Sequence, residues 1–181
     1  MKPLLTLAVC LLSISAHADR RSMIEALSAI ENVPSRAELL TLAGNAAPEL
    51  LRSIVLSPPA QRLAVTRAIA ALGYFPSRAT DRVLRTLITR YRRSKKGIEL
   101  LDLQQALVAY GVAAGRSALP TVRPFLTHLH PDVRIAAATA LWRSDPLAAR
   151  RLLSEQLTRE KEGFVRAEVE RLLARGDGRR R

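Results

Sequence analysis

The sequence has little cysteine, histidine or aromatic content, and these shortages exclude several classes of function. Its 181 residues include one cysteine and three histidines, and only 4% are aromatic. One cysteine cannot form an internal disulfide bond, so a disulfide framework is excluded. Neither a Gly-x-Ser-x-Gly nucleophile elbow nor a glycine-rich phosphate loop is found. We therefore expect a protein with no catalytic residue and no cofactor.

The N-terminus has the pattern of a secretory signal peptide. An apolar run from Leu4 to Ile14 follows Lys2, and Ala16 and Ala18 stand at the two positions that signal peptidase reads. No later segment approaches about 18 uninterrupted apolar residues. We predict that residues 1–18 are cleaved after Ala18, and that the mature chain is periplasmic or secreted, without a transmembrane segment.

Cleavage at this point would also remove the only cysteine, Cys10. The mature chain would then have no thiol for catalysis or for a disulfide bond. The alternative is a lipoprotein in which Cys10 is acylated. Val9 is a poor residue before a modified cysteine, and Leu11 continues the apolar run, so the cleaved signal peptide is the preferred interpretation.

The rest of the chain carries helical periodicity and helix boundaries, and no alternating pattern that would predict strands. Ser35 with Glu38 forms the pattern of a capping box, while Gly44 and Gly73 are typical helix stops. Helices are expected near 21–32, 36–43, 47–57, 60–72, 80–93, 98–113, 117–129, 131–143, 146–158 and 163–175. The fold class predicted from this pattern is all-α.

The most specific stretch runs from Pro131 to Trp142. Small and apolar residues recur along it at i, i+3, i+4, i+7 and i+8, beginning at Val133, which places them on one helical stripe. Pro131 suits the first helical position, and Asp132 suits the positive end of the helix dipole. The stripe is expected to pack against a neighbouring helix.

Similar stretches recur with the length of a helical hairpin. The Ala-Leu-Gly of 71–73, the Ala-Tyr-Gly of 109–111, the Ala-Leu-Trp of 140–142 and the Leu-Leu-Ala of 172–174 are 38, 31 and 32 residues apart. The Val-Arg of 133–134 also recurs at 165–166. Over roughly residues 36–175 the chain resembles the HEAT-repeat family, in particular its short bacterial form related to the repeats of phycobilisome lyases.

This resemblance implies a right-handed α-solenoid of about four stacked helical hairpins. It also implies N-terminal capping helices over 19–46 and a HEAT-like repeat domain over 47–175. The glycines and arginines of 176–181 predict a disordered basic tail. Lyase activity is not implied, because no catalytic residue can be matched. A HEAT-like stack is a scaffold that presents a surface, so we expect a non-enzymatic adaptor that binds another protein.

The best candidate for that surface is basic. The chain has a formal net charge of +13, with 25 arginines against 4 lysines. Such a balance favours acidic partners. Between Arg78 and Lys96, basic residues recur at helical spacings of three, four and seven residues, and this segment contains a single acid, Asp81. The candidate partner-binding residues are Arg78, Arg82, Arg85, Arg92, Arg93, Lys95 and Lys96.

Leu84, Leu87, Ile88 and Tyr91 are expected to form the buried stripe of the same helix. The basic face is then either a solvated surface or a docking site for an acidic protein. An alternative function is binding to lipopolysaccharide, phospholipid or an acidic polymer. Nucleic acid is not an expected partner, since no reading motif is found and no aromatic residues interleave with the basic ones.

A second alternative, a metal-dependent enzyme, rests on His128, His130 and Asp132. These three candidate metal ligands form a His-x-His-x-Asp pattern in a turn between two helices. A metal site needs three or four converging ligands. The pattern is also that of a polar turn before Pro131, which is the interpretation that we prefer.

The aromatic residues Tyr74, Phe75, Tyr110 and Trp142 stand near the ends of the second helices. They are expected to fill gaps between neighbouring hairpins. The alternative is that they line one edge as anchors of a protein interface.

Overall fold

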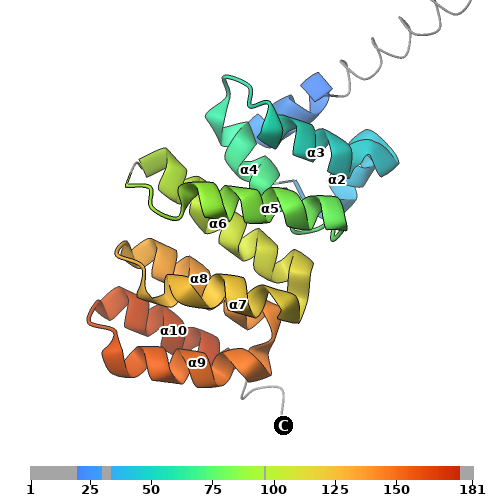
Figure 1. The fold of residues 1–181 in the computed structure, drawn as a ribbon. Helices are drawn as coiled ribbons and strands as arrows, with labels where there is room; N and C mark the ends of the chain where they lie inside the picture. The colour runs from blue at the N-terminus through green and yellow to red at the C-terminus, as the bar shows by residue number, and fades with distance from the viewer. Residues whose placement is uncertain (1–19, 30–33, 96, 176–181) are drawn as a thin grey trace, which may run out of the picture. The chain divides into compact units, whose positions relative to one another are not determined.

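The computed structural model describes residues 20–29, 34–95 and 97–175 of the chain. Helices and turns make up these residues, which include no strand, so the all-α prediction is confirmed for them (Figure 1). The chain divides into two compact units, Met1–Ala71 (unit 1) and Leu72–Arg181 (unit 2). The predicted signal peptide, the residue Lys96 and the predicted tail of 176–181 lie outside the described residues.

Unit 1 is built from short helices with clear local boundaries. A helical segment at 20–28 is followed by α2 (Arg36–Ala43), η1 (Gly44–Ala46), α3 (Ala47–Leu56) and α4 (Arg62–Leu72). The predicted capping box opens α2: Ser35 N donates to Glu38 Oε2 at 2.7 Å, and Glu38 N donates to Ser35 Oγ at 3.3 Å. These bonds satisfy backbone donors that the first helical turn leaves free.

The core of unit 1 is apolar and includes the fully buried side chains of Met23, Leu27, Leu39, Leu51 and Ile54. Long-range hydrogen bonds close the unit around this core. The guanidinium of Arg67 donates to Leu27 O at 3.1 Å, and that of Arg20 donates to Ser57 O at 2.7 Å. Helices far apart in the sequence are therefore tied to one another within unit 1.

The stretch Arg36–Leu56 has the length and apolar composition that a membrane-spanning helix needs, alone among the described residues. A buried helix of a packed core can meet the same criteria. In the structure the stretch is interrupted at Gly44, whose φ of 52° ends α2, and the side chains of Leu51 and Ile54 are buried in unit 1. These are features of a packed helical pair.

Unit 2 contains the longer helices. Its elements are α5 (Arg78–Tyr91), α6 (Gly97–Ala114), η2 (Gly115–Ala118), α7 (Leu119–Val122), η3 (Arg123–Thr127), α8 (Pro131–Ser144), α9 (Pro146–Arg159) and α10 (Gly163–Arg175). The helices predicted from apolar periodicity and from helix-start and helix-stop residues agree with these bounds within about two residues, except in one segment.

The exception is the helix predicted over 117–129, which is wrong as one continuous element. The structure divides this segment into η2, α7 and η3. Pro120 stands in the first turn of α7, and Pro124 in the first turn of η3. Because proline has no backbone N–H, Pro124 cannot donate to residue 120, and its ring crowds the preceding turn. The chain tightens into 3₁₀ turns at these points.

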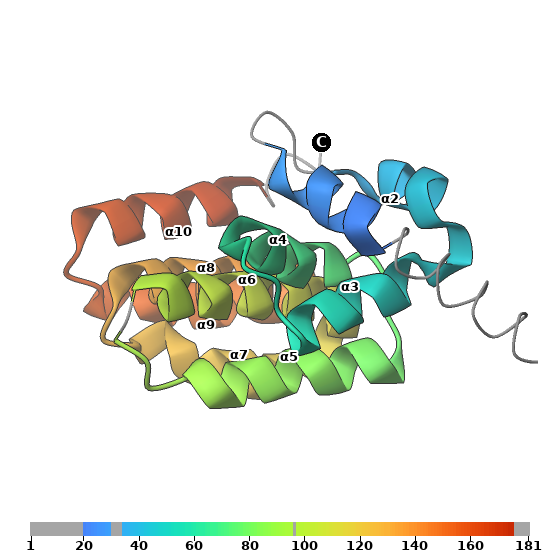
Figure 2. The ribbon, with the colours of Figure 1, turned by 90° about the horizontal axis from the view of Figure 1, so that it is seen from above.

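The helices of unit 2 form two layers. Helices α6, α8 and α10 lie toward one side when the unit is viewed from above, and α5, α7 and α9 lie toward the other (Figure 2). Helix α6 packs against α5 and α8, and α8 packs against α9 and α10. The turns that lead into α6, α8 and α10 share one edge in both views (Figures 1 and 2).

Helices α6 and α8 approach most closely at Gly111 and Ala140. A Cβ atom added to Gly111 would lie 2.8 Å from the Cα of Ala140 and 2.9 Å from its carbonyl carbon, and closer still to its carbonyl oxygen. The hydroxyl of Ser144 also donates to Ala140 O at 2.7 Å and to Gly111 O at 3.2 Å. Only glycine permits this approach of two helix backbones.

Replacing Gly111 with alanine should therefore destabilise the fold, although alanine is the better helix former. The added methyl group would meet backbone atoms that cannot rotate away, and we expect a loss of about 1–3 kcal/mol in the free energy of unfolding. Urea denaturation of the purified variant measures this loss.

Gly163→Ala is the matched control, because a Cβ at the first residue of α10 meets no atom within 4 Å. Its free energy of unfolding should stay within about 0.5 kcal/mol of the original, or rise. Equal behaviour of the two variants would contradict a close contact between α6 and α8.

Candidate functional site

Helix α5 separates apolar from basic side chains. The hydroxyl of Ser77 caps its N-terminus by accepting from Thr80 N at 3.1 Å. One face buries Leu84, Leu87 and Ile88, as the periodicity predicted, together with Val83, which was not predicted. Tyr91, predicted in the same buried stripe, is only half-buried at the end of the helix. The other face carries the exposed arginines, so packing of the apolar stripe orients them outward.

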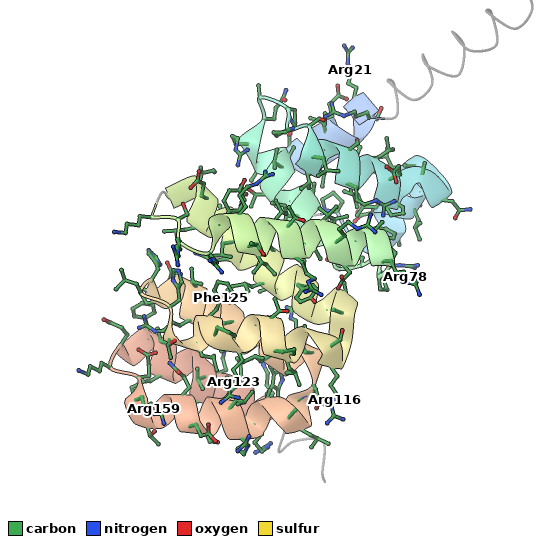
Figure 3. The ribbon with its side chains drawn as sticks, in the orientation of Figure 1. Arg21, Arg78, Arg116, Arg123, Phe125 and Arg159 are labelled. Atoms are coloured by element: carbon green, nitrogen blue, oxygen red, sulfur yellow. The ribbon has the colours of Figure 1, made fainter. Side chains whose placement is uncertain are left out.

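The predicted basic residues of α5 line an open groove of about 970 Å³. The groove lies between α5 and the segment formed by the end of α6 and η2, where Ala113, Ala114 and Ser117 form the opposite wall. Arg78 stands near one end of α5 (Figure 3). The charged residues that line the groove are Arg78, Asp81, Arg82, Arg85 and Arg90.

The arginines of the groove are not neutralised by neighbours. Within the described part of the chain, no carboxylate forms an ion pair with Arg78, Arg82, Arg85 or Arg90. Asp81, the acid on the groove wall, also interacts with the phenol of Tyr110. The groove therefore has a net positive charge.

Tyr110 lies beneath this surface, with a side chain that is almost completely buried. Burial raises the pKa of Tyr110, a hydrogen bond with Thr121 lowers it, and the Asp81 carboxylate raises it again. The phenol is thus neutral near pH 7 and can act as a hydrogen-bond donor to Asp81. The interaction of Tyr110 with Asp81 links α6 to α5.

The remaining basic candidates lie beyond the helix. Helix α5 ends at Tyr91, and Arg92, Arg93 and Lys95 follow in a turn closed by Ser94 N donating to Tyr91 O at 2.9 Å. Lys96 lies outside the described residues. The single helical stripe predicted from Arg78 to Lys96 is therefore wrong in its second half, because the helix ends before these residues.

The three candidate metal ligands share one turn but do not converge. His128 Nδ1 accepts a hydrogen bond from His130 N at 3.1 Å, so that nitrogen is occupied by the backbone. His130 Nδ1 lies 3.7 Å from Asp132 Oδ2. In the parts of the chain that the structure describes, no three histidine, cysteine or acidic side chains gather around a common point.

A buried ion pair that the sequence did not single out connects this turn to the next one. Arg134 Nε and Nη2 donate to the two carboxylate oxygens of Glu160 at 2.8 and 2.7 Å. Arg134 Nη1 donates to the carbonyls of His128 and Leu129 at 3.0 and 3.2 Å. Gln156 Nε2 also donates to Glu160 at 2.8 Å. The pair thus joins the turn before α8 to the turn before α10.

Arg166 occupies the position equivalent to Arg134 when the Val-Arg pattern recurs at residues 165–166. Its guanidinium donates to the carbonyls of Leu157 and Glu160 at 2.5 and 3.3 Å. Both arginines thus bind a carbonyl group of the turn that precedes their own helix, and Arg166 also binds one in the last turn of α9. The recurring dipeptide could have revealed this shared role, but the carboxylate partner of Arg134 is 26 residues away and has no local signal.

The four aromatic residues differ in burial. Phe75 and Tyr110 are buried, whereas Tyr74 is 41% exposed. Trp142 is half-buried and lines a second cavity of about 560 Å³ with the exposed Leu147. Packing between helices therefore accounts for Phe75 and Tyr110, but not fully for Trp142.

No protein-family model, no curated protein and no solved structure matches this chain. The HEAT resemblance therefore stays a prediction from the residues that carry it. Any functional conclusion must rest on the geometry and charge of the described residues.

The Arg134–Glu160 pair should make the free energy of unfolding depend on pH in the acidic range. Hydrogen bonds from Arg134 lower the pKa of Glu160 from 4.5 to about 2. The stabilisation is fully present above about pH 4.5 and is lost as the pH falls toward 2, because the folded protein then has to protonate this carboxylate. Near neutral pH, Glu160→Gln should cost about 3 kcal/mol, since a buried guanidinium loses its counter-ion.

The difference in unfolding free energy between the original protein and Glu160→Gln should shrink as the pH falls from about 4.5 to 2. Glu155→Gln, on the same helix, is the control: its exposed side chain lies 3.5 Å from Arg151, and such pairs contribute about 0–1 kcal/mol. Denaturant titrations at several pH values measure both variants. A constant difference for Glu160→Gln would contradict the lowered pKa.

Proposed function

We propose that this protein is an exported, non-enzymatic HEAT-like adaptor that binds an acidic segment of a partner protein. The observation that carries the proposal is the groove beside α5. Its lining includes four arginines that have no ion-pair partner among the described residues, and a single acid, Asp81. Residues 1–18 would direct export, and the mature chain would act in the periplasm or outside the cell.

The groove suits a protein segment because it combines charge with apolar and hydroxyl surface. Arg82 and Arg85 stand one helical turn apart, so carboxylates spaced along an extended or helical segment can meet both. The opposite wall offers Ala113, Ala114 and Ser117, where the backbone of a partner can come close without bulky side chains. Arginine is also enriched among the residues that dominate protein interfaces.

The helix order supports a right-handed α-solenoid as the scaffold of this adaptor. In unit 2, α5 packs with α6, the segment of α7 and η3 packs with α8, and α9 packs with α10. A single hairpin cannot bury its apolar face, and stacking neighbouring hairpins supplies that burial. Arg134 and Arg166 each donate to the carbonyl of the residue six positions earlier, His128 and Glu160, as expected of successive repeats.

A photocrosslinking residue at Thr86, which is exposed on the groove wall, should recover one specific protein from native envelopes. Arg82→Glu together with Arg85→Glu should remove this crosslink, because the groove would then repel an acidic segment. The expected loss of affinity is roughly tenfold or more, and it should decline as salt is added.

The matched control carries the same change in charge elsewhere: Arg123→Glu together with Arg159→Glu, both exposed in unit 2 (Figure 3). This variant should keep the crosslink. A groove position that yields no protein, or a product equally sensitive to both double variants, would overturn the adaptor proposal. Retention of an acidic polymer without any protein crosslink would instead favour the alternative of binding anionic polymers.

A further inference from the structure

A more apolar pocket than the arginine groove lies just beyond the C-terminal end of α5. It has a volume of about 700 Å³ and lies between the turn after α5 and the turn before α8. The pocket thus falls in the usual range of ligand sites, about 300–1,000 Å³. Both turns belong to the edge of unit 2 from which α6 and α8 begin (Figure 1).

The apolar surface of this pocket is formed by Leu100, Leu129 and Pro131. Leu100 is buried at the base, whereas the side chain of Leu129 is 85% exposed, the most exposed of the large apolar residues of the described chain. Exposure of a whole leucine side chain to water is unfavourable, and it becomes favourable when an apolar group covers it.

Leu129 is held in this position by a rigid turn. Its carbonyl and that of His128 accept hydrogen bonds from Arg134, which is fixed in turn by Glu160. The ring of His128 stacks on Phe125 with 6.1 Å between the ring centroids. These bonds fix the turn so that the side chain of Leu129 stays at the surface and does not enter the protein core.

Basic groups form the rim of the same pocket. Arg93 and Lys95 line it from the turn after α5, and no aspartate or glutamate lines it. Both side chains are exposed, and neither forms an ion pair within the described residues. The carboxylate of Glu99 accepts a hydrogen bond from Ser94, a residue of the pocket lining, and adds one negative charge near the two cations. An anionic group at the rim would thus meet two cations that have no ion-pair partner among the described residues.

We infer that this pocket binds an anionic phospholipid, with an acyl chain against Leu100, Leu129 and Pro131 and the headgroup phosphate between Arg93 and Lys95. An exposed apolar side chain beside basic residues complements the two parts of such a lipid. The site shares no residue with the groove of Arg82 and Arg85, so it stands independently of the adaptor function. It would hold the adaptor at an anionic membrane surface.

The test measures binding of dihexanoylphosphatidylglycerol, a soluble anionic phospholipid, to the purified protein by titration calorimetry below the micelle concentration. Dihexanoylphosphatidylcholine, with the same chains and no net charge, should bind at least roughly tenfold more weakly. Glycerophosphoglycerol, with the same headgroup and no chains, should also bind at least roughly tenfold more weakly.

The variants separate the two parts of the site. Arg93→Glu with Lys95→Glu should reduce the affinity for the anionic lipid at least roughly tenfold, and Leu129→Ser should do the same. The controls are Arg82→Glu with Arg85→Glu, which makes the same change in charge, and Leu147→Ser, which removes a leucine that is 74% exposed elsewhere. Both controls should leave lipid binding unchanged.

Several outcomes would overturn the lipid site. They are absence of binding, equal binding of the zwitterionic lipid, equal binding of the chain-free headgroup, and equal effects of the variants and their controls. Circular dichroism of each variant establishes that it is folded. In the Arg93→Glu Lys95→Glu variant, loss of lipid binding with an intact Thr86 crosslink would separate this site from the adaptor groove. Lipid binding by the original protein without any Thr86 crosslink would overturn only the adaptor proposal.

Discussion

The close approach of α6 and α8 at Gly111 and Ala140 is the contact on which unit 2 depends. Helix α6 packs against α5, and α8 packs against α9 and α10, so this pair of helices joins the two halves of unit 2. The approach requires an absent side chain at one position and small ones around it, because the backbones themselves are in contact. The positions of the two proposed binding surfaces depend on this contact, because the groove uses the end of α6 and the apolar pocket uses the beginnings of α6 and α8.

Polar bonds then fix the turns that connect these helices. The guanidinium of Arg134 donates hydrogen bonds to two carbonyls of the turn before α8 and to the carboxylate of Glu160. Without Arg134, this turn would be a short polar loop that lacks these bonds. A buried ion pair is a costly way to gain stability, since both charges must leave water. Here the pair specifies geometry: it fixes the turn that presents Leu129 and joins that turn to the one before α10.

The groove along α5 and the pocket after the C-terminal end of α5 have different chemistry although both are basic. In the groove, arginines lie opposite small and hydroxyl-bearing residues, which suits a charged protein segment. In the pocket, Arg93 and Lys95 border an exposed leucine and a proline, which suits a molecule with a charged head and an apolar tail. Net charge does not distinguish these environments, and the difference arises from the residues that lie beside the basic side chains in each.

Local sequence signals determined much of this fold. Apolar periodicity predicted the buried stripe of α5, the Ser35–Glu38 pair predicted the start of α2, and glycines predicted where helices end, because each signal acts over a few residues. Pro120 and Pro124 also act locally, yet helical periodicity alone concealed the breaks that they cause. Only the tertiary structure decided that α5 ends before the last basic residues, that Glu160 is the partner of Arg134, and that Leu129 stands beside Arg93. The last two of these relations join residues distant in the sequence, so they exist only once the helices of unit 2 have packed together.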